Sequence, residues 1–260
     1  MKKKYFAWIR LLLIVLALVF AVSLLFSVKQ QTSSDTNVLF VLDVSNSMNA
    51  RDIIQNDKKN LSDVNKLSRL DLAKEFIQNI MASESDVQYG LLVFWQSAVT
   101  LVPATADTGS FIDHLLALNT NILPGGWTNW GSFDSLISSR EEYSKIIFFS
   151  DADEWIRTQK FEWAENAKKY FVGIWTEGGA VVRYANDNIL RSKGKNVYSS
   201  LDIDVAESLS SQLDADLFIV ESLESIDSVI NDIVWDSVKF SFVQFNILLI
   251  LLTLCVLFVL

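Results

Sequence analysis

The feature that most constrains the fold is an apolar run that ends in regularly spaced polar residues. The run Val38-Leu39-Phe40-Val41-Leu42 shows no alternation of polar and apolar side chains, which predicts a strand buried on both faces of a sheet. It is followed at once by Asp43, Ser45 and Ser47, an acid and two hydroxyls at every second position. Oxygen ligands of this kind suit a hard cation such as Mg2+. The alternative is a plain turn, because Asp, Ser and Asn all favour turns.

The two ends of the chain are long apolar segments. Residues 6–28 carry a single charge, Arg10, and residues 240–260 carry none. Each segment is long enough to cross a bilayer as a helix, which takes about 20 residues. Lysines at positions 2–4 favour a cytoplasmic N-terminus, so the part between the helices would lie outside the cytoplasm. The alternative is a signal peptide cleaved near residues 21–23.

We therefore expect a protein of the cell membrane (in bacteria, the inner or cytoplasmic membrane), anchored at both ends. The expected organisation is a cytoplasmic N-terminus at 1–5, a transmembrane helix at 6–28, a linker at 29–36, one domain at 37–235, a linker at 236–239 and a transmembrane helix at 240–260.

Charge and composition exclude several classes of function. The segment between the apolar ends holds all 31 acidic residues and 18 of the 22 basic ones, a net charge of −13, which argues against nucleic acid as a partner. The chain has one cysteine, Cys255, and one histidine, His114, too few for a disulfide or a zinc site. It also lacks a Ser–His pair, a phosphate-binding loop and a dinucleotide motif, so we do not expect an enzyme.

Strand and helix patterns alternate along the central segment. Strands are expected at 38–42, 87–94, 97–102, 145–150, 170–176 and 216–220, with the second and third joined as a hairpin. Helices are expected after the capping sequence Ser68-Arg-Leu-Asp71, around His114, and at 131–140, 158–169, 204–213 and 222–235. This alternation predicts an α/β fold: a doubly wound, mostly parallel six-stranded sheet with one antiparallel edge strand.

Polar residues follow more than one of these strands. Asp151 closes the strand at 145–150 as Asp43 closes the first, and Thr128 lies on a glycine-containing loop before a helix. In an open α/β sheet, ligands bind outside the carboxyl ends of the strands. One cation could therefore be bound by Asp43, Ser45, Ser47, Thr128 and Asp151, with a coordination position left for water or an outside ligand.

These residues, in this order, resemble the metal-ion-dependent adhesion site of von Willebrand factor type A domains. The resemblance extends over residues 37–235. It is closest to the membrane-anchored bacterial aerotolerance (Bat-type) proteins, as the phrases at 43–52, 68–74, 90–94 and 123–128 show. It implies Mg2+ (or Mn2+ or Ca2+) held by Asp43, Ser45 and Ser47, with Thr128 joining as the site switches and Asp151 acting through water. It also implies that a protein partner donates a carboxylate to the open position, and that other Bat-type subunits and a MoxR-type AAA ATPase are partners.

The sequence departs from the family pattern beside the predicted site. Trp127 stands where a small residue is usual, and Ala152 stands where glycine is usual. Trp127, Trp130 and Trp155 all fall on loops near the predicted cation. They form either a partner-binding rim, since tryptophan is enriched at interfaces, or lids that pack over the sheet edge.

The function expected from this sequence is a membrane-anchored, metal-dependent protein–protein interaction module in a Bat-like complex. One alternative is an enzyme of metal-dependent phosphoryl transfer. Phosphatases of the haloacid dehalogenase type also have an Asp after the first strand, but they need a second Asp at the position where this chain has Ser45. Another is a structural membrane protein with a degenerate metal site.

Overall fold

The computed structural model describes most of the central segment of the 260-residue chain. The described residues are 37–53, 66–84, 86–120, 122, 128–138, 143–152, 166–176, 178–184 and 186–234. The two predicted membrane helices and their linkers lie outside these residues, as do Trp127 and Trp155. Within the described part, no helix is long and apolar enough to span a bilayer.

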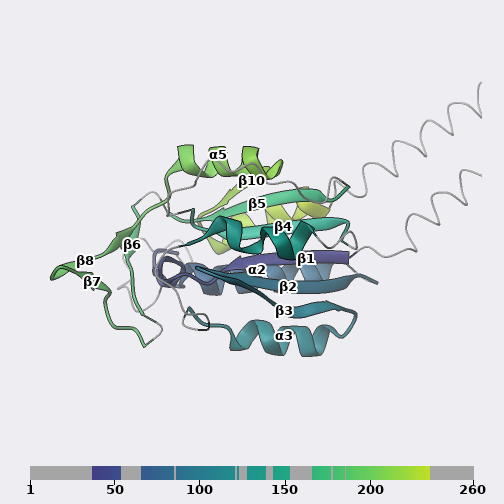
Figure 1. The fold of residues 1–260 in the computed structure, drawn as a ribbon, viewed down its shortest axis with the longest axis horizontal. Coiled ribbons are helices and arrows are strands. Elements are labelled where there is room, and N and C mark those ends of the chain that lie inside the picture. The colour runs from purple at the N-terminus through teal and green to yellow at the C-terminus, as the bar shows by residue number, and fades with distance from the viewer. Residues whose placement is uncertain are drawn as a thin grey trace, which may run out of the picture. The chain divides into compact units, whose positions relative to one another are not determined.

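Six strands form one sheet in the order β10-β5-β4-β1-β2-β3 (Figure 1). Their bounds are β1 Asn37–Asp43, β2 Gln88–Phe94, β3 Ala98–Thr105, β4 Lys145–Ser150, β5 Lys168–Ile174 and β10 Asp216–Val220. Only β2 and β3 pair in antiparallel fashion, and β3 is an edge strand. This confirms the predicted mostly parallel sheet with one antiparallel edge. The winding reverses beside β1, which lies between β2 and β4.

The described helices follow the strands in the predicted order, while residues 158–165 of the helix predicted at 158–169 lie outside the described residues. They are α2 Arg69–Ser83, α3 Thr108–Ala117, α4 Asp134–Ser138, α5 Ile203–Leu213 and a last helix at 223–234, with short 3-10 turns η1 Asn46–Asn49 and η3 Trp130–Phe133. The predicted cap of α2 is present, since the Ser68 hydroxyl accepts a hydrogen bond from the Asp71 N–H at 3.1 Å.

Both faces of the sheet are packed with aromatic side chains, which is why β1 and β4 are buried along their whole length. On one face, Phe40 of β1 contacts Phe111 of α3, with ring centroids 5.9 Å apart. On the other face, Phe94 of β2 contacts Trp130 and Phe133 of η3, each with centroids 4.9 Å apart. A strand covered on both sides needs an unbroken apolar run, as residues 38–42 provide.

The predicted boundary between the helix at 158–169 and the strand that follows it is wrong. The sequence pattern predicts a helix through Lys169, but β5 begins at Lys168. Lys168 pairs with Asp216 at 2.6 Å and Lys169 with Asp214 at 3.7 Å, next to the neighbouring strand β10. The local mixture of charges is typical of an exposed helix surface. The two lysines belong to a strand instead, and their acidic partners lie more than 40 positions away in the sequence.

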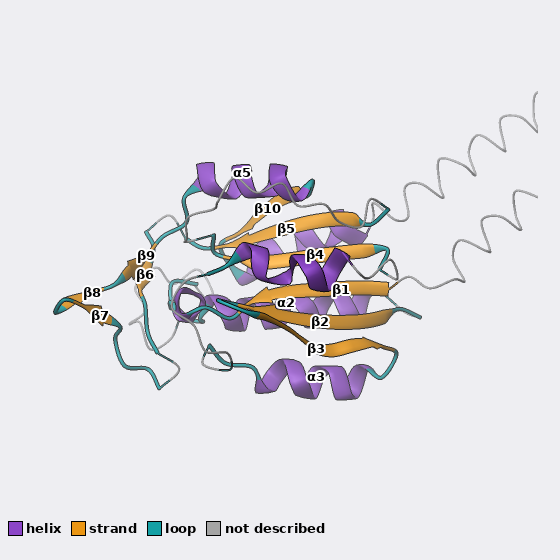
Figure 2. Ribbon diagram, in the orientation of Figure 1, coloured by secondary structure: helices purple, strands orange, loops and turns teal. Residues whose placement is uncertain are grey.

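Two smaller sheets lie between β5 and α5. Strand β6 (Ala180–Val181) pairs with β9 (Tyr198–Ser199), and β7 (Arg191–Ser192) pairs with β8 (Lys195–Asn196). We call residues 180–199 the arm. Figure 2 shows the β7–β8 hairpin projecting beyond the main sheet on the side where β1 ends.

Candidate metal-binding site

The candidate site lies where the two central strands β1 and β4 end side by side. These strands are parallel, and Leu42 is paired with Phe149 in their register. The next residues, Asp43 and Ser150, therefore emerge together at the carboxyl edge, with Asp151 directly after them. Asp43 and Asp151 are each only 1% exposed. The pairing of β1 with β4 thus brings together two acids that are 108 positions apart in the sequence.

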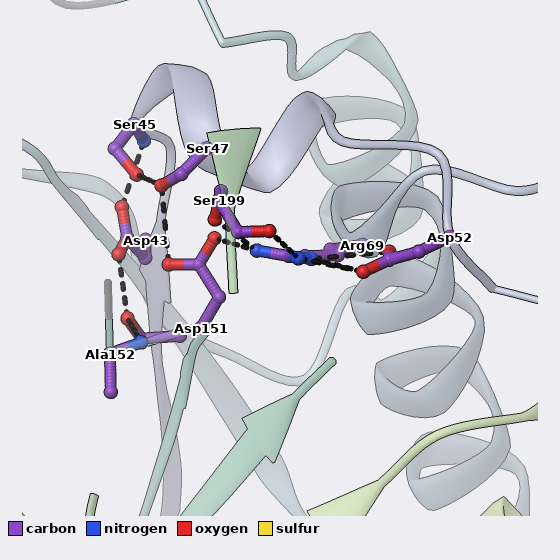
Figure 3. Close-up of polar contacts among 9 residues, drawn as sticks. Asp43, Ser45, Ser47, Asp52, Arg69, Asp151, Ala152 and Ser199 are labelled. Carbon is purple, nitrogen blue, oxygen red and sulfur yellow. Dashed lines mark hydrogen bonds and ion pairs between the residues drawn. The ribbon is translucent and has the colours of Figure 1, made fainter. Parts of the chain in front are cut away.

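Four of the five predicted ligands meet in one hydrogen-bonded group (Figure 3). The Ser45 N–H donates to Oδ1 of Asp43 at 2.8 Å, and the hydroxyls of Ser45 and Ser47 lie 2.9 Å apart. The Ser47 hydroxyl donates to Oδ1 of Asp151 at 3.2 Å. Turn η1, which begins directly after Ser45, carries Ser47 toward the end of β4. The regular spacing of the acid and the hydroxyls therefore gives one convergent cluster of oxygens.

Ser150, which the sequence analysis did not single out, completes the support of Asp43. Its hydroxyl donates to Oδ2 of Asp43 at 2.7 Å and accepts the N–H of Ala152 at 3.0 Å. Ala152 has φ of 50°, in the left-handed region where glycine is favoured. The backbone at Ala152 is therefore strained, as expected for an alanine at a position where the family usually has glycine.

A buried arginine links Asp151 to a third carboxylate. The Arg69 side chain is fully buried, and its Nη1 donates to Oδ2 of Asp151 at 2.7 Å. Its Nε and Nη2 donate to Asp52, with the shortest distance 2.6 Å, and Nη1 and Nη2 also donate to the hydroxyl and carbonyl of Ser199 at 2.5 and 3.1 Å. Arg69 therefore joins the site to the loop at Asp52 and to the base of the arm.

Sequence reasoning missed this role of Arg69 and treated the residue only as part of a capping sequence. A signal was present, because Arg69 is the first residue of α2. A cation at a helix N-terminus is opposed by the helix dipole, so it needs acidic partners from elsewhere in the fold. Asp52 and Asp151 are those partners.

Three buried acids, Asp43, Asp52 and Asp151, lie in this group. Arg69 donates to Asp52 and Asp151, whereas Asp43 accepts from the Ser45 N–H and the Ser150 hydroxyl. Burial, followed by the charge of Asp151, raises the pKa of Asp43 to about 7. For Arg69, burial acts to lower the pKa, but Asp151 and Asp52 outweigh it and the pKa is raised. The group therefore favours one more positive charge, either a proton or a metal cation.

Thr128 is the fifth predicted ligand, and Trp130 is one of the three tryptophans expected near the cation. Thr128 is partly exposed, and its neighbour Asn129 donates its N–H to the Trp95 carbonyl at 2.8 Å, which holds this segment just beyond the end of β2. The hydrogen bonds described above do not include Thr128. Trp130 is 4% exposed and packs on Phe94, so it belongs to the core and not to a partner-binding rim. Trp127 and Trp155 lie outside the described residues.

The comparisons with known proteins agree with this fold. Residues 38–153 match the family model of the von Willebrand factor type A domain. This part of the chain is a von Willebrand factor type A domain. The match spans β1 to β4 and includes all five predicted ligands. A comparison with curated proteins gives no match.

Solved structures with the same fold include BatB and an aerotolerance-related membrane protein. The crystal structure of BatB from Bacteroides thetaiotaomicron is 19% identical, with a TM-score of 0.62, and the match covers 78% of this chain and 99% of that one. The structure of an aerotolerance-related membrane protein from Bacteroides fragilis NCTC 9343 is 20% identical, with a TM-score of 0.63 and the same coverage. At this level of identity the likeness establishes the type A fold.

The residues present fit a hard divalent cation. The oxygens of Asp43, Ser45, Ser47 and Asp151 converge, and no sulfur or imidazole ligand is part of the group. Within the described residues, no cluster of three or more His, Cys, Asp or Glu side chains is arranged to hold a metal. A cation here would therefore depend on the serine hydroxyls as well as the two carboxylates, an oxygen-only set that suits Mg2+ better than zinc.

Proposed function

We propose that this chain is a membrane-anchored interaction module that binds a protein partner through a divalent cation. Mg2+, or Mn2+ or Ca2+ in its place, would be held by Asp43, Ser45, Ser47 and Asp151, with Thr128 as a further ligand. The observation that carries this proposal is the convergence of the oxygens of Asp43, Ser45, Ser47 and Asp151 at the end of β1. Burial, and then the charge of Asp151, raise the pKa of Asp43 there. The match of residues 38–153 to the type A domain also supports the proposal, since such domains often bind a divalent metal and mediate protein interactions.

The bound cation would supply an open coordination position for a carboxylate of the partner. The protein's own residues hold the site in place: Ser150 orients Asp43, and Arg69 holds Asp151 at 2.7 Å. Arg69 also neutralises one carboxylate, so the site keeps a moderate negative charge that favours a divalent cation. These roles require binding and positioning, not proton transfer, which is why we favour an interaction module over an enzyme.

The surroundings of this module are part of the same proposal. Apolar segments at 6–28 and 240–260 would anchor the chain in the cell membrane, with the domain outside the cytoplasm. The fold shared with BatB and with an aerotolerance-related membrane protein supports membership of a Bat-like membrane complex. Other Bat-type subunits and a MoxR-type AAA ATPase would be the partners of such a complex.

Thermal unfolding of the full chain in mild detergent tests the metal site. A ligand that binds only the folded state raises Tm, by an amount equivalent to about 2.7 kcal/mol at one hundred times its Kd. Mg2+ or Mn2+ should therefore raise Tm by several degrees over the EDTA-treated protein. Asp43→Ala should abolish this rise, while Ser208→Ala on the surface of α5 should keep it.

Two results would favour the alternatives. A wild-type Tm that is the same with EDTA, Mg2+ and Mn2+ would point to a structural membrane protein with a degenerate site. Hydrolysis of p-nitrophenyl phosphate that is lost in Asp43→Asn would point to phosphoryl transfer instead.

A further inference from the structure

The arm is fastened to the residues that build the candidate site. At one end, Nδ2 of Asn49 donates to the carbonyls of Arg183 and Tyr184 at 3.1 and 2.7 Å, and Asn49 belongs to the same turn, η1, as Ser47. At the other end, Ser199 accepts from Arg69, which also holds Asp151. The base of the arm is therefore fixed to the same residues that position the candidate ligands.

The outer part of the arm is a tight hairpin. Ser192 of β7 is paired with Lys195 of β8, so only two residues form the turn. These residues, Lys193 and Gly194, have φ of 50° and 79°. Two consecutive positive φ values are typical of a type I′ turn, whose twist matches that of the flanking strands. The hairpin backbone thus has a defined shape.

The hairpin is basic in an otherwise acidic protein. Arg191, Lys193 and Lys195 are all exposed, and the structure assigns none of them an ion pair with a described residue. No acidic residue occurs between Asp187 and Asp202, although the whole chain has a net charge of −9. Such a local reversal of charge favours the approach of an acidic partner.

Exposed tyrosines lie beside the hairpin. Tyr198 of β9 is 70% exposed and Tyr184 is 38% exposed. Tyrosine and arginine are enriched at protein interfaces, where an aromatic ring provides contact area and a polar tip. The hairpin turn carries no large apolar side chain that could enter a lipid bilayer, since residues 191–196 are Arg-Ser-Lys-Gly-Lys-Asn. These features fit a polypeptide better than a membrane surface.

We propose that the arm is the second half of the docking surface and binds an acidic segment of the partner protein. Figures 1 and 2 show the β7–β8 hairpin beyond the carboxyl ends of the central strands, the edge at which the candidate site lies. One carboxylate of the segment would reach the cation, and further carboxylates would pair with Arg191, Lys193 and Lys195. This inference rests on the proposed function and adds the chemical class of the partner.

The test measures binding of a short fluorescein-labelled peptide rich in glutamate to the full chain in mild detergent, by fluorescence anisotropy. The triple variant Arg191→Gln, Lys193→Gln, Lys195→Gln should bind about eightfold more weakly at low salt, since each exposed ion pair contributes a factor of about two. The charge-keeping triple Arg191→Lys, Lys193→Arg, Lys195→Arg should bind like the wild type. Lys168→Gln, at the opposite end of the sheet, should also have no effect.

Three results would overturn the inference: no binding of the glutamate peptide, equal binding of the same peptide with glutamine in place of glutamate, or unchanged binding by the neutral triple variant. Displacement of the peptide by glycerol 3-phosphate at equal charge would overturn it too, because the hairpin would then select a phosphate headgroup.

The two proposals can fail separately. A Mg2+-dependent rise in Tm without peptide binding would leave the metal site in place and overturn the role of the arm. Peptide binding that depends on the hairpin but is equal with Mg2+ and with EDTA would support the arm and overturn the metal-dependent half of the proposed function.

Discussion

Nη1 of Arg69 lies 2.7 Å from Oδ2 of Asp151, and both side chains are buried. This ion pair joins the first residue of α2 to the residue that follows β4, and the same guanidinium group holds Asp52 and Ser199. It is therefore the point at which the candidate metal site, the loop after η1 and the arm are connected. Removing one partner of a buried ion pair strongly lowers the stability of the fold, because the other charge is then left buried without compensation.

Replacing Arg69 by methionine should destabilise the domain strongly. The variant would leave the carboxylates of Asp52 and Asp151 buried without their cation, which costs about 3–5 kcal/mol when one partner of a buried pair is lost. The free energy of unfolding by urea, measured on the full chain with EDTA present, checks this. Arg51→Met is the matched control, because Arg51 is 31% exposed and pairs with Asp187 at 3.3 Å; its effect should stay below about 1 kcal/mol. Equal effects of the two substitutions would refute the importance of the buried group.

The metal-free domain should lose stability as pH rises from about 4 to about 7. Asp43 has a pKa of about 7 in the folded state, raised by burial and then by Asp151, against 3.8 as the ordinary value. Between these values the folded state keeps a proton that the unfolded state has released, so the free energy of unfolding falls with pH and levels off above about 7. One pKa unit corresponds to about 1.4 kcal/mol, so the loss amounts to a few kcal/mol.

Urea unfolding at pH 5 and pH 8 in EDTA measures this effect, with Asp43→Asn as the comparison. Other acidic groups titrate in the same range, so the informative quantity is the difference between the wild type and the variant. That difference should change with pH in the direction given above. Identical pH dependence of the two proteins would show that Asp43 does not carry a raised pKa.

Glycine at position 152 should be tolerated or slightly stabilising. Ala152 has φ of 50°, a conformation that costs a residue with a side chain about 1–2 kcal/mol, and glycine avoids this cost. The gain is reduced by the loss of a buried methyl group and by the greater freedom of the unfolded chain, which leaves a net stabilisation of about 0–1 kcal/mol. Ala152→Val should destabilise by more than about 2 kcal/mol, because a branched side chain is both strained and crowded there.

Ala206→Gly is the control for this substitution. Ala206 is also fully buried, but it lies inside α5, where glycine costs about 1 kcal/mol through helix propensity alone. Thermal or urea unfolding should therefore separate the two alanine-to-glycine variants. A loss of stability at position 152 as large as that at 206 would argue against the strained backbone.

The elements that the sequence predicts well are those encoded by neighbouring residues. The run at 38–42 is apolar at every position because β1 is covered on both faces, and the Ser68 cap is made with Asp71 three residues later. The convergence of Asp43 with Asp151 also followed, because ends of parallel strands share one edge of a sheet. Predicting these features requires the local sequence and the general fold class, but no specific contact between distant residues.

The elements that the sequence predicts poorly depend on residues far apart. Arg69 finds its partners 17, 82 and 130 positions away, so no local pattern shows that it is buried. Trp130 lies after a glycine-containing loop, and only its position beside Phe94 and Phe171 decides that it faces the core. The start of β5 at Lys168 depends in the same way on Asp216.

Counting bound Mn2+ on the full chain by electron paramagnetic resonance tests the central claim most directly, because free and protein-bound Mn2+ give different signals. We expect one saturable Mn2+ per chain that Mg2+ displaces, weakened by about tenfold or more in Ser47→Ala, because the variant removes a hydroxyl that meets both Ser45 and Asp151. Ser208→Ala should bind like the wild type. The absence of saturable binding, or equal affinity in the wild type and Ser47→Ala, would contradict a cation site at the end of β1.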